Sequence, residues 1–340
     1  MSSRNPPIVR AAYLHLYFDL FREIGIPTTR ALAHSRLPGL VEEQSDTYVS
    51  LPLALECLAR NGSALTPMDL GFHASRSLSL DSFDPYLHAS LNDSVSGLER
   101  SRRYFQLLAI EDNSLVPGIR REGGHVRLSM KMPRLDQHPH ACLAEWINVQ
   151  ALVTILRSIA GSGWCPIEIT LASRLPASQV SFETFPNTRI LVGQKSTSIL
   201  VAREVLVSSC VSGTDDTALD VGALARDDHT AMESWSFKSA LRSLIEPYIC
   251  EGRADLAMAA DLVGVSRRTL QRRLKNCNTS YAEILQEARF RIARSQLSDE
   301  HARVCDVATM CGYENPQHFS SVFRQMTGLS PSEFSSSRPQ

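Results

Sequence analysis

Two segments in the C-terminal third of the chain share one pattern, and this repeat limits the possible fold more than any other feature. Residues 256–265 (LAMAADLVGV) and 304–313 (VCDVATMCGY) align at an offset of 48. Each has helical apolar spacing and a central Ala, and then a Gly before an apolar residue, which is typical of a short helix that ends in a tight turn. A second helix-like segment follows each copy, at 266–275 and at 316–325.

The residue types at the shared positions predict two helix-turn-helix motifs. A small Ala lets the second helix pack closely on the first, and Gly supplies the positive φ that ends the first helix. Ser266 is a good N-cap for the second helix, as Asn315 with Pro316 behind it is in the other copy. Apolar residues spaced i, i+4 are expected to face inward. The paired positions are Ala260 and Ala308, Gly264 and Gly312, Leu270 and Phe319, and Leu274 and Phe323.

A third helix is predicted between the two copies, over 281–297. A helix of this length spans about 25 Å. With the turns at its ends, it can hold two recognition helices about 34 Å apart, which is one turn of B-DNA. Both recognition helices would then enter successive major grooves on one face of the duplex.

The charge of the chain is unevenly distributed, although the net charge is only −1. From Ser236 onward there are 14 basic and 11 acidic residues, whereas the preceding part has 21 basic and 25 acidic residues. Residues 266–275 hold five basic side chains and no acidic one. A polyanion such as double-stranded DNA is therefore expected to bind this helix.

At these residues the chain resembles the AraC/XylS family of bacterial transcription regulators. The resemblance rests on SRRTLQRRLK (266–275), on Arg289 and Ala293-Arg294, and on VATMCGYENPQHFSSVFRQMTGLSPSEF (307–334). It implies a sequence-specific DNA-binding regulator of a bacterial promoter, an activator or a repressor, with RNA polymerase as a partner. We expect the protein to be a homodimer in the cytoplasm. The first 200 or so residues resemble the arabinose-binding-type domain of the branch that includes ornithine-utilisation regulators.

The resemblance also assigns the residues that contact DNA. Arginine can bind guanine and glutamine can bind adenine with two hydrogen bonds each. Many family members have Arg where this chain has Ser321, so we expect base readout to be concentrated in the first motif and the second to bind mainly the DNA backbone. The base-contacting residues are Arg268, Gln271 and Arg272 in the first motif, and Pro316, Gln317, His318 and Ser321 in the second. The phosphate-contacting residues are Ser266, Arg267, Arg273, Lys275, Ser320 and Arg324.

The rest of the chain mixes two periodicities. Residues 11–25, 51–61, 86–110 and 144–159 have helical spacing, whereas 125–132, 167–171, the run near Ile190 and 198–201 alternate as strands do. We therefore expect an α+β N-terminal domain at 1–213, an acidic linker at 214–235, and an all-α DNA-binding domain at 236–338 with two helix-turn-helix motifs joined by a long helix.

Other chemistry has little support in the sequence. The eight cysteines are scattered without a CxxC pair, which favours reduced thiols in a cytoplasmic protein. His301, Cys305, Cys311 and His318 match no common zinc spacing, and no cofactor motif or catalytic constellation is present, so we expect no metal, no cofactor and no enzymatic activity. No apolar run is expected to cross a membrane, for which about 18 residues are needed.

Three functions stay open for the N-terminal domain. It can bind a small-molecule effector, which is the interpretation we favour, although its pocket residues cannot be recognised from the pattern. It can serve only to dimerise or to bind a partner protein, without an effector. The third and weakest alternative is an enzyme-like domain fused to a DNA-binding one.

Overall fold

The computed structural model describes residues 5–82, 96–135, 138–208, 235–298 and 302–336, and the chain divides into two compact units. The sheet unit comprises Ala12–Ser35 and Leu51–Ser234. The helical unit comprises Met1–Ala11, Arg36–Ser50 and Trp235–Gln340. The predicted linker at 214–235 lies outside the described residues, apart from Trp235.

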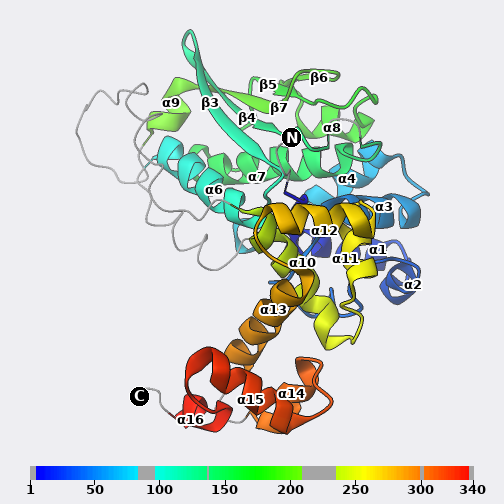
Figure 1. The fold of residues 1–340 in the computed structure, drawn as a ribbon. Helices are drawn as coiled ribbons and strands as arrows, with labels where there is room; N and C mark the ends of the chain where they lie inside the picture. Colours follow the sequence, from blue (N-terminus) through cyan, green and yellow to red (C-terminus); the bar gives the residue numbers. More distant parts are fainter. Residues whose placement is uncertain (1–4, 83–95, 136–137, 209–234, 299–301, 337–340) are drawn as a thin grey trace. The chain divides into compact units, whose positions relative to one another are not determined.

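A five-stranded sheet forms one layer of the sheet unit, in the order β3-β4-β7-β5-β6 (Figure 1). All pairings are antiparallel except that of β5 with β6. The alternation predicted for 125–132 is confirmed, because Val126, Leu128 and Met130 of β4 are buried while the ends of the strand are exposed. The strands are β3 (Val116–Glu122), β4 (His125–Lys131), β5 (Glu168–Thr170), β6 (Arg189–Leu191) and β7 (Thr197–Ala202).

Helices make up the second layer of this unit, and α7 (Cys142–Ala160) is its central element. Trp146 on α7 is fully buried, its ring lies 4.8 Å from that of Phe72, and its indole N–H donates to Met68 Sδ at 3.0 Å. The other helices are α1 (Ala12–Glu23), α2 (Thr28–Ala33), α3 (Leu51–Asn61), α4 (Pro67–Ser75), α6 (Gly97–Glu111), α8 (Gln179–Thr184), α9 (Arg203–Val207) and the 3₁₀ turn Leu80–Ser82.

By length and composition α7 is long and apolar enough to cross a membrane. Among the described residues it is the one helix with this length and apolar composition. Most of α7 is buried inside the unit, as in the core helix of a soluble fold.

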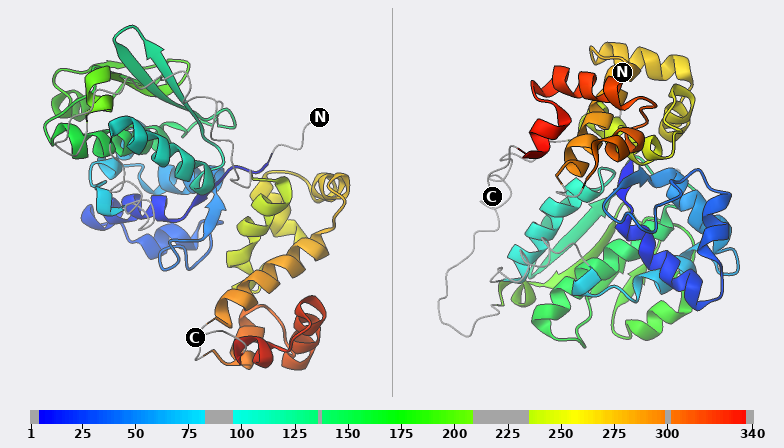
Figure 2. Two further views of the ribbon diagram at one scale, coloured as in Figure 1. Left: turned by 90° about the vertical axis from the view of Figure 1, so that its left-hand side faces the viewer. Right: turned by 90° about the horizontal axis from the view of Figure 1, so that it is seen from below.

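The helical unit consists mainly of α10 to α16, with α13 running between two helix pairs (Figure 2). We call α11 and α12 the first helix pair, and α14 and α15 the second helix pair. All four helices lie where the repeat predicts them, and α13 is the predicted connecting helix. The bounds are α10 (Phe237–Cys250), α11 (Leu256–Val263), α12 (Arg267–Asn276), α13 (Tyr281–Gln296), α14 (Val304–Met310), α15 (Pro316–Thr327) and α16 (Pro331–Ser336).

Two N-terminal segments complete the helical unit. Strands β1 (Ile8–Arg10) and β2 (Tyr48–Ser50) form an antiparallel two-stranded sheet, and β2 packs against α10. The Tyr248 hydroxyl on α10 donates to the carbonyl of Arg36 at 2.6 Å, and the Ser50 hydroxyl donates to that of Leu262 on α11 at 3.1 Å. Residues 1–11 and 36–50 therefore group with the C-terminal helices, whereas the sequence analysis places them in the N-terminal domain. The limits of the functional domains stay a prediction.

Candidate nucleic-acid interface

The turn between α11 and α12 forms as the residue types predict. Gly264 ends α11 in the left-handed conformation with φ of 69°. The Ser266 hydroxyl then caps α12 by accepting a hydrogen bond from Thr269 N at 3.2 Å. These two residues fix the direction in which α12 leaves the turn.

α12 has one buried face and one basic face. Leu270 and Leu274 are buried, as predicted from their spacing. The residues expected to contact DNA lie mostly on the opposite side, and within the described chain the basic ones make no ion pair with a carboxylate. The exposed members are Ser266, Arg267, Arg268, Gln271, Arg272 and Lys275. We call this set the basic face.

Arg273 lies apart from the basic face. It is half-buried, and its guanidinium carbon is 6.0 Å from the centre of the Phe237 ring on α10. This contact is a cation–π interaction inside the helical unit. Its predicted phosphate contact would require the side chain to serve both purposes.

α15 repeats the arrangement with less charge. The Asn315 side chain caps it by accepting from Gln317 N at 2.8 Å, and Phe319 and Phe323 are buried as predicted. The Ser320 hydroxyl is half-buried and donates to the carbonyl of Pro316 at 2.9 Å, so it is already engaged within the helix. The remaining predicted residues are exposed, and only Arg324 is charged: Pro316, Gln317, His318, Ser321 and Arg324.

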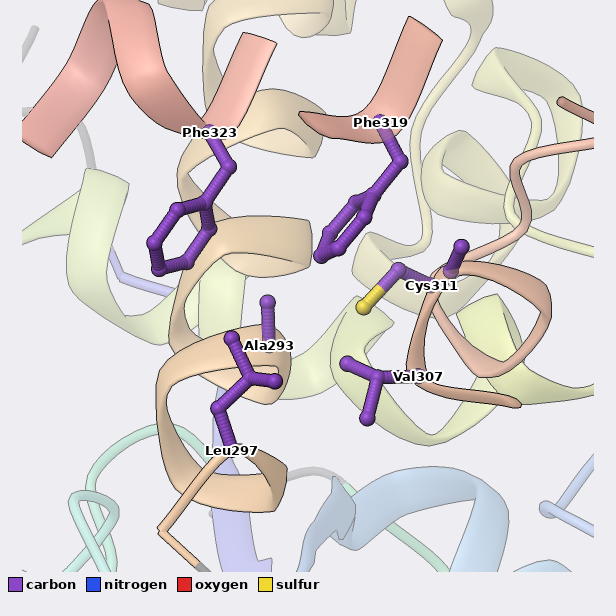
Figure 3. Close-up of a cluster of buried hydrophobic side chains, with 7 residues drawn as sticks. Ala293, Leu297, Val307, Cys311, Phe319 and Phe323 are labelled. Carbon is purple, nitrogen blue, oxygen red and sulfur yellow. The ribbon is translucent and has the colours of Figure 1, made fainter. Parts of the chain in front are cut away.

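An aromatic core holds the second helix pair on α13 (Figure 3). Phe323 lies 5.8 Å from Phe319, 5.5 Å from Phe290 and 5.4 Å from Phe334, measured between ring centres. Tyr313 packs on the edge of this core. Aromatic pairs in tilted or edge-to-face arrangements contribute roughly 0.5–1.5 kcal/mol each beyond their buried area.

Arg289 on α13 has a positioning role that the sequence analysis did not assign. Its guanidinium carbon is 4.9 Å from the centre of the Tyr313 ring, and Nη2 donates to the carbonyl of Gly312 at 3.4 Å. The side chain thus holds the turn of the second helix pair against α13. Its place in the family motif was the only signal in the sequence.

Two arginines at the junction of α10 and α13 are paired with carboxylates. Arg242 on α10 approaches Glu287 on α13 at 3.4 Å, and Arg291 on α13 approaches Glu246 on α10 at the same distance. Burial raises the pKa of Glu246, although the nearby guanidinium groups oppose the shift. These ion pairs join α10 to α13, so the arginines involved serve the fold.

The cysteines of this region fit a structural role. Cys311 is buried in the aromatic core, and this burial raises the pKa of its thiol to about 12. Cys305 is exposed, and His301 lies outside the described residues. Among the residues that the structure describes, no three His, Cys, Asp or Glu side chains converge to hold a metal ion.

Comparison with known proteins identifies both parts of the chain. Residues 259–337 match the family described as a helix-turn-helix domain. Residues 25–209, more than half of the chain, match the arabinose-binding domain of AraC transcription regulators. The chain belongs to the AraC family of transcription regulators. Its relatives are regulators rather than enzymes, which confirms the predicted resemblance and excludes the enzyme alternative.

Curated relatives match a part of the chain about 80 residues long. The porin thermoregulatory protein EnvY of Escherichia coli is 38% identical over 77 residues, which are 23% of this chain and 30% of EnvY. The ornithine utilization regulator of Pseudomonas aeruginosa is 31% identical over 80 residues, 24% of each chain. The matched region thus spans less than a third of either relative. The crystal structure of CdpR from Pseudomonas aeruginosa matches 96% of this chain and 98% of its own, at 17% identity and a TM-score of 0.42.

Proposed function

We propose that this AraC-family regulator recognises a specific operator in double-stranded DNA with two helix-turn-helix motifs, the first and second helix pairs. The basic face of α12 supports this proposal most directly. Its arginines and Lys275 are exposed, lack carboxylate partners within the described chain, and lie opposite the buried Leu270 and Leu274. Charged side chains held in this way are available for phosphates and for the edges of bases.

The two motifs are proposed to divide the work. Arg268, Gln271 and Arg272 read bases in one major groove, and Lys275 with its neighbours binds phosphates. The second motif contacts mainly the backbone, with Arg324 as the one charged side chain of α15. α13 has 16 residues, which corresponds to about 24 Å, and with its flanking turns this length suits two successive major grooves.

The intact protein is proposed to act as a cytoplasmic homodimer that binds a small-molecule effector and contacts RNA polymerase. Dimerisation would occur through the sheet unit. Two tethered DNA-binding units typically gain about 10²–10⁴-fold in affinity when their geometry fits the sites. Sedimentation at micromolar concentration tests this point, and a protein that stays monomeric both free and on DNA would refute it.

Selection of preferred sites from a pool of random duplexes, followed by binding titrations, tests the DNA-binding proposal. Arg272→Ala should weaken binding to the selected site by about 1–3 kcal/mol and relax the preference at one or two base pairs. Lys275→Ala should weaken binding to all sequences and reduce the slope of log affinity against log salt by about 1. Arg76→Ala, at an exposed arginine after α4, is the matched control and should leave binding unchanged.

Two outcomes would contradict this assignment. If Arg272→Ala leaves the selected sequence and its affinity unchanged, the basic face does not read bases. If the unmodified protein selects no sequence at all, the proposal that it recognises a specific operator is wrong. A regulator that needs no effector, the second candidate, would bind its site equally well with and without every small molecule tested.

A further inference from the structure

A cavity of about 560 Å³ lies within the sheet unit. Four stretches of chain converge on it: the end of β4 with described residues of the loop that follows, the start of α7, the residues after β5, and those before β7. Pockets for small molecules commonly have volumes of about 300–1,000 Å³. The cavity is therefore large enough for a small organic molecule.

Glu145 on α7 joins the walls of this cavity. Its buried carboxylate accepts hydrogen bonds from Ala172 N at 2.8 Å, from Ser173 N at 2.9 Å and from the Thr197 hydroxyl at 3.0 Å. Burial raises the pKa of Glu145, while the three donors stabilise its charged form. These bonds connect α7 to the segments after β5 and at the start of β7, so they fix the walls of the cavity relative to one another.

Besides His138, whose pKa is lowered by burial and by the neighbouring His140, three basic side chains line the cavity, namely Lys131, Arg174 and Lys195, which we call the basic rim. All three are exposed, and none forms an ion pair within the described residues. Among the lining residues that the structure describes, Glu145 is the one carboxylate, and its oxygens already accept three hydrogen bonds. The lining therefore has a net positive charge that favours an anion.

Another part of the lining is apolar. It consists of the buried residues Met132, Leu135 and Cys142, which we call the apolar wall. Burial raises the pKa of the Cys142 thiol to about 12, so at neutral pH this side chain is uncharged. A buried thiol of this kind packs like a small hydrophobic group. A ligand that fills the cavity therefore needs an apolar body as well as an anionic group.

We propose that this cavity binds a small organic acid, whose carboxylate contacts the basic rim and whose body packs on the apolar wall. A neutral molecule of the same shape would leave the three cations without a partner, and a cation would be repelled by them. Assigning this acid as the effector rests on the proposed function, whereas the binding site itself does not.

Thermal unfolding and calorimetric titration of the full-length protein test the site. The probes are straight-chain acids from butyrate to octanoate and benzoate, each paired with its primary amide. At least one acid should raise the unfolding temperature and bind 10-fold or more tightly than its amide. The triple variant Lys131→Gln, Arg174→Gln, Lys195→Gln should lose at least 10-fold in affinity, whereas Arg76→Gln, an exposed arginine outside the cavity, should lose none.

The proposal is wrong if no acid stabilises the protein more than its amide, or if the triple variant binds the acid as tightly as the unmodified protein. Lys195→Gln alone, at an exposed position, should weaken binding of the acid about 3-fold. This single variant replaces the triple variant in the test if the triple variant does not fold. DNA binding is measured separately, in the absence of any acid, so that a failure of the acid site and a failure of the proposed function can be told apart. The triple variant should bind the selected duplex normally, because the basic face belongs to the helical unit.

Discussion

The two helix pairs share a scaffold but differ in the chemistry of their exposed faces. In both pairs the first helix ends at a turn that contains a glycine. The second helix begins after a residue whose side chain caps it, and it buries two apolar side chains. α12 contains four arginines and a lysine, whereas α15 contains one arginine. Scaffold and surface are thus specified by different positions, and the charge of one face can change without altering the packing beneath it.

Their cores differ as well. The first pair buries Leu270 and Leu274, while the second buries Phe319 and Phe323 in a cluster of aromatic rings. α11 is capped by Asp255, which accepts from Met258 N at 2.7 Å, but the corresponding residue of α14 is Arg303, whose side chain makes no capping bond. The second pair therefore depends more on its aromatic core than on its helix caps.

Phe323→Ala is expected to have the largest effect. Loss of a fully buried Phe should lower the free energy of opening of α15 by about 3–5 kcal/mol. Native-state hydrogen exchange of the α12 and α15 amides measures this for each pair separately. The exposed Met326→Ala on the same helix is the control. An equal loss of protection in α12 would show that the two pairs open as one unit.

Substitution of the turn glycines should have an intermediate effect. Gly264 and Gly312 have φ of 69° and 72°, and an L-residue in this region costs about 1–2 kcal/mol. An alanine at 312 would also bring its Cβ within 3.3 Å of Arg289 Nη2, whereas nothing lies within 4 Å at 264. Gly312→Ala should therefore reduce hydrogen-exchange protection more than Gly264→Ala.

Gly163→Ala is the control for this comparison, because Gly163 has open space and no positive φ. It should leave protection in both helix pairs unchanged. If Gly264→Ala were the more harmful of the two turn variants, the role given to Arg289 in holding the second turn would be wrong.

The smallest effects are expected at Ser321. Ser321→Arg should raise the affinity for DNA by less than 10-fold, since it adds a charge to an exposed and weakly basic face. Ser321→Ala should change affinity and sequence preference very little. Binding titrations on the selected duplex and on an unrelated one measure both. A large loss of specificity in Ser321→Ala would mean that this serine reads a base.

The local sequence pattern was sufficient to predict the helices that carry the expected DNA-binding residues. Helical spacing, a serine cap and a turn glycine predicted α12, and the same signals predicted α15. The helix over 51–61 and the strand over 125–132 were also predicted correctly, because their periodicity is long enough to be distinct. For the helix predicted over 86–110, the structure describes only the part from 96 onward, and α6 begins at Gly97.

Other features depend on contacts that no local pattern contains. β1 and β2 have three residues each, too few to show an alternation, and they pair across about 40 residues of chain. The cavity takes its charge from Lys131, Arg174 and Lys195, which lie in separate segments. The exposed positions of the basic face followed from helix geometry, but the cation–π contact of Arg273 with Phe237 depends on the position of α10.

The small sheet of β1 and β2 makes the helical unit a discontinuous domain. The chain passes between the units after Ala11, Ser35 and Ser50, and again before Trp235. A hybrid regulator made by fusing a foreign N-terminal half to residue 236 would remove β2 from α10 and leave Tyr248 without the carbonyl of Arg36. A hybrid that keeps the helical unit intact would replace only two segments, 12–35 and the region from 51 to the end of α9. Residues 1–11 and 36–50 would stay with the DNA-binding helices.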